Sequence, residues 1–193
     1  ATGIKITVPV DYSKRQEFKD ATNKVCKYFK TIPHITNDTQ VVAPAKVTQF
    51  PNCWFEAGSG AYALMGNVMY PINPDIKGLE EFRDLSSQGK LVIPFEIGEL
   101  DFDASRESLK YAADLTALLK MKYNEIVAEF AKTIHSSIAA SKDAFRAVQA
   151  FNKVVKNFSQ SLATAIYKDM TYQGKPLSEY FPDRRNTNWN MDI

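Results

Sequence analysis

The stretch "IHSSIAASKDAF", residues 134–145, decides the fold, because the chain either turns there or continues through it as one helix. It lies within residues 99–173, which contain none of the chain's eight glycines and nine prolines. A single helix over 106–169 would be about 95 Å long, far beyond the usual length in a globular protein. Ser141 followed by Asp143 is typical of a helix start, whereas the two central alanines favour continued helix. We expect an antiparallel helical hairpin, with a continuous or kinked rod as the alternative.

Apolar residues at helical spacing flank this stretch on both sides. Steps of three and four residues place side chains on one face of an α-helix. The two sets are Leu109, Ala112, Thr116, Leu119, Tyr123, Ile126 and Phe130, then Phe145, Val148, Phe151, Val155, Phe158, Leu162 and Ile166. Ser105 can cap the first helix. Further apolar residues widen the face of that helix and indicate burial on two sides.

The first hundred residues have the opposite character, with short apolar runs separated by glycines and prolines. Alternating apolar residues over 4–10 predict an edge strand. The capping-box pattern of residues 13–16, followed by apolar residues at helical spacing, predicts a helix that ends near Pro33. Further strands are expected around the turn at 58–60 and within 90–103. A small antiparallel sheet with the N-terminal helix packed on one face is the simplest arrangement.

Together these patterns predict an α+β fold in a single domain over residues 1–193. It comprises a mixed α/β half at 1–104, a long helical half at 105–170 and an irregular arm at 171–193. The length of 193 residues suits one buried core. A hydrophobic fraction of 45% and a charged fraction of 24% are typical of a soluble globular protein.

The C-terminal arm carries aromatic and basic side chains among prolines and asparagines, without periodicity. Aromatic rings of this kind usually cover a surface, either on their own domain or on a neighbouring subunit. The candidate assembly residues are Tyr180, Phe181, Arg184, Arg185 and Trp189.

Long polar side chains form a row on the second predicted helix, at spacings of three and four residues. The row consists of Lys142, Arg146, Gln149, Lys153, Lys156 and Gln160. Its four cations could follow a phosphate backbone, and such contacts would weaken as salt rises. An ordinary solvated helix face explains the same row. The candidate nucleic-acid-binding residues are Lys142, Arg146, Lys153 and Lys156.

No catalytic or metal-binding signature is visible. His34 and His135 are isolated, without the cysteine or glutamate spacing of a zinc site. A nucleophilic pair of Cys53 and His34 has no supporting sequence context. The acidic residues within 96–103 could hold a hard cation, but a solvated strand that leads into a helix N-terminus explains them as well. We predict no catalytic residues, no metal and no cofactor.

The leading functional hypothesis is a structural protein that self-associates as a coat-, sheath- or filament-like subunit. We expect a homo-oligomer, with nucleic acid as a further partner, although the net charge of +2 is too small to argue for one. One alternative is a membrane-active, pore-forming-like protein that inserts its helical hairpin, which the lysines along the hairpin disfavour. A second is an enzyme whose site the sequence does not reveal. No leader or membrane-spanning run is visible, so we expect the protein in the cytoplasm or in a particle assembled there.

Overall fold

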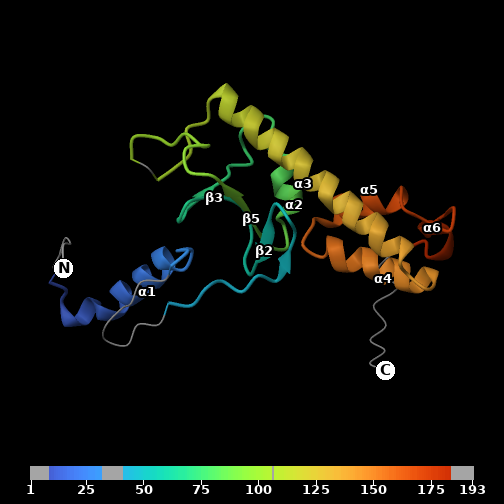
Figure 1. Ribbon diagram of the computed structural model, residues 1–193, viewed down its shortest axis with the longest axis horizontal. Coiled ribbons are helices and arrows are strands. Elements are labelled where there is room, and N and C mark those ends of the chain that lie inside the picture. The colour runs from blue at the N-terminus through green and yellow to red at the C-terminus, as the bar shows by residue number, and fades with distance from the viewer. Residues whose placement is uncertain (1–8, 32–40, 106, 184–193) are drawn as a thin grey trace. The chain divides into compact units, whose positions relative to one another are not determined.

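The computed structural model divides by its residue contacts into two compact units, and each unit is considered by itself. The first comprises Ala1–Pro44 with Gly66–Val68, and the second comprises Ala45–Met65 with Met69–Ile193. Figure 1 shows the helices and strands along the chain. The residues that the structure describes are 9–31, 41–105 and 107–183.

The first unit contains a short 3-10 turn at Tyr12–Lys14 that leads directly into helix α1, Arg15–Cys26. The side chain of Asp11 accepts hydrogen bonds from the Ser13 nitrogen at 2.8 Å and from the Ser13 hydroxyl at 2.6 Å. Asp11 therefore caps this start, where we had predicted a capping box from Ser13. α1 is confirmed as a helix but ends at Cys26, before the predicted end, and none of its residues is buried.

The N-terminal strand predicted at 4–10 lies largely outside the described residues. Its last two residues, Pro9 and Val10, are described and do not belong to a strand.

A five-stranded sheet has the order β1-β2-β5-β3-β4. Its strands are β1 Thr48–Gln49, β2 Trp54–Glu56, β3 Ala61–Met65, β4 Val68–Pro71 and β5 Lys90–Phe95. β5 pairs antiparallel with β2 and parallel with β3. The sheet is therefore mixed, and the wholly antiparallel sheet that we predicted is wrong in this respect.

The mixed order arises because β5 inserts between β2 and β3, the two strands on either side of the turn at 58–60. The chain reaches β5 after β4 and the short helix α2, Glu81–Leu85. Leu91, Val92 and Ile93 of β5 are all buried, as a continuous apolar run in a central strand should be.

The helical hairpin is present, as predicted. Helix α3, Ala113–Ala139, and helix α4, Ala144–Val155, lie side by side, as Figure 1 shows. Asp143 caps α4, because its side chain accepts a hydrogen bond of 2.7 Å from the backbone nitrogen of Arg146. The corner therefore forms without glycine or proline.

α3 begins eight residues later than the Ser105 start that we predicted. The backbone before it pairs across a loop, with a bridge between Phe102 and Leu109 and a 3.0 Å hydrogen bond from the Asp103 nitrogen to the Ser108 carbonyl. The Ser105 hydroxyl donates to the Asp103 carboxylate at 2.7 Å, so it caps no helix.

The second long helix is interrupted after α4, and the chain continues as α5, Gln160–Lys168. The Ser159 nitrogen donates to the Asp84 carbonyl at 2.7 Å, and the Ser159 hydroxyl caps α5. The Gln88 nitrogen donates to the Asn157 carbonyl at 3.1 Å. These contacts with the segment around α2 replace the hydrogen bonds of a continuous helix.

The core of the second unit lies between α3 and one face of the sheet. The ring of Phe130 on α3 lies 4.5 Å from that of Phe50 and 6.2 Å from that of Phe55, and Phe158 completes the cluster at 5.0 Å. α3 buries Leu115, Leu119, Ile126, Phe130, Ile134 and Ile138.

Within the second unit, the helix packed against the sheet region is α2. Phe82 of α2 lies with its ring 5.3 Å from that of Tyr123 on α3, and Phe82 and Leu85 are both buried. In the described part of the chain, no helix combines the length and the apolar character needed to cross a membrane.

Candidate interaction surfaces

The four basic residues of the predicted row are all exposed, but they do not lie on one continuous helix. Lys142 lies in the corner before α4, Arg146 and Lys153 lie on α4, and Lys156 follows its last residue. Arg146 donates a hydrogen bond of 3.1 Å to the side-chain oxygen of Gln149. The row therefore spans about 20 Å along α4 and its two ends.

The break after α4 removes Gln160 from the row and leaves a short basic surface. Gln160 is the first residue of α5, a separate helix. Asp143, the acidic residue next to Lys142 in the sequence, accepts a hydrogen bond from the Arg146 nitrogen as the cap of α4. What remains is a set of four cations on the exposed side of a helix whose other side is buried through Ala147, Val148 and Phe151.

The described part of the C-terminal arm packs on its own unit. The Tyr167 hydroxyl donates to the Phe181 carbonyl at 2.9 Å, and the ring of Phe181 lies 6.0 Å from that of Phe145 on α4. The ring of Tyr180 lies 6.2 Å from that of Tyr172. Arg184, Arg185 and Trp189 lie outside the described residues.

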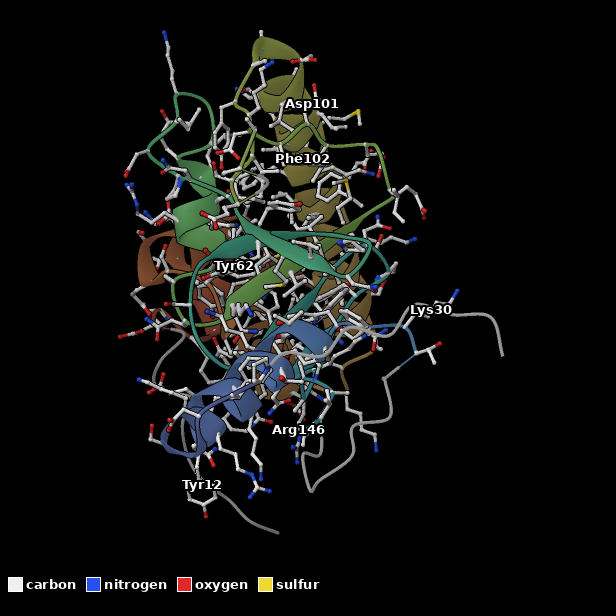
Figure 2. All side chains as sticks on the ribbon, turned by 90° about the vertical axis from the view of Figure 1, so that its left-hand side faces the viewer. Tyr12, Lys30, Tyr62, Asp101, Phe102 and Arg146 are labelled. Carbon is white, nitrogen blue, oxygen red and sulfur yellow. The ribbon has the colours of Figure 1, made fainter. Side chains whose placement is uncertain are left out.

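The first unit carries an apolar surface that we did not anticipate from the sequence. Phe18 and Val25, seven residues apart and so on one face of α1, are 51% and 60% exposed. Tyr12, just before the helix, is 85% exposed and projects outward in Figure 2. The helical periodicity did identify this face, but we assigned it to the core.

The same segment is basic. Residues 14–30 contain six basic and two acidic residues, a formal charge of +4 in a chain whose total is +2. The basic residues are Lys14, Arg15, Lys19, Lys24, Lys27 and Lys30. α1 is therefore an amphipathic helix with an apolar face that its own unit leaves exposed and a polar face rich in cations.

A partly buried ion pair lies on the sheet face opposite Phe55. The Lys90 ammonium lies 3.5 Å from one carboxylate oxygen of Glu56, and the Trp54 indole nitrogen donates to the other at 2.8 Å. The same ammonium lies 4.8 Å from the centre of the Tyr62 ring. Neither sequence spacing nor motif indicated this pair, because 34 residues separate the two charges.

Tyr62 also lines a cavity of about 290 Å³ between the start of β3 and α2, together with Phe82 and Arg83. A second cavity, of about 460 Å³, lies at the hairpin corner and includes His135, Ser141 and Tyr172. The Ser141 hydroxyl donates to the Ser137 carbonyl at 2.8 Å, so its proton is not directed at His135.

Cys53 is unsuited to nucleophilic chemistry. Its side chain is buried, and this burial, with a smaller contribution from the charge of Glu129, raises the pKa of the thiol to about 12. His34, the histidine considered and rejected as its partner, lies outside the described residues. Among the side chains that the structure describes, no group of three or more histidines, cysteines, aspartates or glutamates could hold a metal ion.

No family model, curated protein or solved structure matches this chain. Its function therefore has to be inferred from its surfaces.

Proposed function

We propose that the protein is a structural subunit that associates with copies of itself, as coat-, sheath- and filament-like proteins do. The observation that supports this proposal is the uncovered apolar face of α1, formed by Phe18 and Val25 with Tyr12 beside it. Water in contact with such a face is unfavourable, so covering it with another protein surface releases free energy. Such a subunit would act in the cytoplasm or in a particle assembled there.

The support for assembly comes from a different part of the chain than the sequence suggested. The wide apolar face predicted for the first long helix is satisfied within the unit, because α3 buries its main stripe against the sheet and α4. Insertion of the hairpin into a bilayer would break this core, for example the contacts of Phe130, and no observation favours it. The described part of the arm also packs on its own unit.

Light scattering coupled to size exclusion, over a wide range of protein concentration, tests the proposal. We expect the mean mass to rise with concentration for the native chain. A variant with Phe18→Ser and Val25→Ser should remain monomeric, because it lacks the apolar face. The matched control is Met121→Ser, which removes an exposed apolar side chain from α3. A native chain that stays monomeric at the highest concentration reached contradicts the proposal.

Nucleic acid is a further partner within the same proposal, through Lys142, Arg146, Lys153 and Lys156. The supporting observation is that all four side chains are exposed on one short surface. Binding of a labelled single strand can be followed by fluorescence anisotropy. The logarithm of the binding constant should fall linearly with the logarithm of the salt concentration, with a slope of about 0.7 for each phosphate contact.

Lys153→Ala with Lys156→Ala should lower that salt slope by about 1.4, the contribution of two contacts. The control is Lys168→Ala with Lys175→Ala, two exposed lysines outside the row. Equal slopes for the two double variants would show that the row does not contact the phosphates.

A further inference from the structure

The uncovered face of α1 needs a partner that is both apolar and acidic. The apolar positions Phe18, Ala21 and Val25 lie on one side of the helix, and at 100° per residue Arg15 lies at one edge of that side and Lys24 at the other. Glu17 lies next to Lys24 and pairs with Lys14 at 2.8 Å, so the segment around the face keeps a net positive charge. An isolated helix of 12 residues is marginal in water, so docking would also stabilise α1 itself.

Residues 96–105 have the complementary character. They include four acidic residues and no basic one, and near their start Ile97, between Glu96 and Glu99, is 84% exposed. Glu96, Glu99 and Asp101 are exposed as well. The Glu99 carboxylate accepts a 2.6 Å hydrogen bond from the Glu96 nitrogen, which gives the loop around Ile97 a defined shape. An exposed apolar side chain next to two acidic residues suits an exposed apolar face on a segment with a net positive charge.

We propose that α1 of one copy docks, by its apolar face, on residues 96–103 of a neighbouring copy. This inference rests on the proposed function and names the two surfaces that join the subunits. Phe18 and Val25 cover Ile97, while Arg15 and Lys24 face the neighbouring carboxylates.

The charges decide which surface of the second copy is used. Pairing of α1 with α1 would bring together two segments that each carry +4, so a two-fold interface through this helix is electrostatically unfavourable. Docking on residues 96–103 joins opposite charges and uses a different surface on each copy. An interface of this kind is head-to-tail and builds a ring or an open filament. It should weaken as ionic strength rises.

Two charge-reversed variants test the docking. Variant one carries Arg15→Glu and Lys24→Glu, and variant two carries Glu96→Lys and Asp101→Lys. Each alone places like charges across the interface, so we expect its association to weaken at least tenfold in sedimentation velocity. An equimolar mixture restores opposite charges in both directions, and we expect it to assemble as the native chain does. Docking within one chain cannot be restored by mixing.

Matched controls carry the same change in charge at other exposed positions, Lys168→Glu with Lys175→Glu and Asp169→Lys with Glu179→Lys. They should assemble as the native chain does. Circular dichroism of each variant confirms that its helices are retained.

The outcomes separate this inference from the proposed function. A native chain that never associates overturns both. Native assembly that persists in the two variants, or a loss that mixing does not restore, overturns only the docking. Restoration in a single chain that carries all four substitutions, without restoration by mixing, would mean that α1 docks on its own chain and would also overturn it.

Discussion

Helices α1 and α3 share the same sequence pattern and differ in what covers it. Both place apolar side chains three, four and seven residues apart, which gives each helix an apolar face. α3 buries six side chains, and Phe130 at its centre lies among three other aromatic rings. α1 buries none, and Phe18 at its centre is half exposed.

The difference shows that an apolar stripe predicts a helix and the face that favours burial, but not which surface covers that face. α3 finds its partner within its own unit, on the sheet. α1 finds none among the described residues of its own unit, and this is why we place the interface between subunits there. The following experiments test that contrast, starting with the largest expected effect.

Phe130→Ala should destabilise the second unit by about 3–5 kcal/mol, because it removes a ring from a packed aromatic cluster and leaves a cavity. Phe18→Ala should change the free energy of unfolding by much less, under about 1 kcal/mol, since about half of that side chain is already exposed to water. Urea unfolding followed by near-ultraviolet circular dichroism measures both, at a concentration low enough to keep the chain monomeric. Similar losses for the two variants would erase the contrast between the helices.

The two cysteines report on the same contrast, because one lies in each unit. Cys26 on α1 is partly exposed, whereas Cys53 is 2% exposed with its pKa raised to about 12 by burial. A rise from the ordinary value of 9.0 lowers the thiolate fraction near pH 8 about a thousandfold. We expect iodoacetamide to label Cys26 and to spare Cys53, as judged by peptide mass spectrometry. In denaturant both should react. Comparable labelling in the native chain would mean that the core around Cys53 opens readily.

The helix caps provide a smaller test. Asp143→Ala should cost about 1 kcal/mol, because the first turn of α4 loses the acceptor of the Arg146 backbone nitrogen. Asp143→Asn keeps an acceptor and serves as the control. Asp11→Ala, the matching change in the first unit, should leave the unfolding of the second unit unchanged. A large effect of Asp11→Ala would show that the two units unfold together.

The smallest expected effect concerns pH. Hydrogen bonds from the Ser108 and Ser105 hydroxyls lower the pKa of Asp103 to about 2. Because this folded value lies below that of the unfolded chain, the contribution to stability is complete above about pH 4 and disappears as pH falls toward 2. Ser108→Ala should raise the pKa of Asp103, measured by NMR titration of its carboxyl carbon. In the first unit, the Ser13 hydroxyl lowers the pKa of Asp11 in the same way, and Ser13→Ala should raise it. An Asp103 titration unchanged by Ser108→Ala would contradict this hydrogen bond.

Local sequence signals predicted the helical hairpin, because the capping group Asp143 lies within three residues of the nitrogen that it accepts from. The same reasoning missed the end of α4. The helix ends where the Ser159 nitrogen donates a hydrogen bond to the carbonyl of Asp84, 75 positions earlier in the chain. A local sequence pattern cannot predict such a distant contact. Reasoning from local patterns also placed the start of α3 too early. The segment before the helix instead forms a loop in which the Asp103 nitrogen donates to the Ser108 carbonyl.

The sequence predicted some of the candidate surfaces and missed others, because only some of them are formed by residues close together in the chain. The basic residues on α4 were found correctly as exposed, since a row opposite an apolar face lies in solvent. The apolar face of α1 was identified from its spacing, and within its own unit none of its residues is buried. The pair of Glu56 and Lys90 was not found, because only the pairing of β2 with β5 brings the two charges together.

The sequence by itself determined that α1, α3 and α4 are helical, the faces on which their apolar side chains lie and the corner between α3 and α4. These follow from backbone hydrogen bonds and side-chain spacings within a few residues. Only the tertiary structure decided the strand order, the break before α5 and which apolar face is buried. Each of these depends on contacts between segments far apart in the chain, such as the pairing of β5 with β2 and β3 and the packing of α3 in the core.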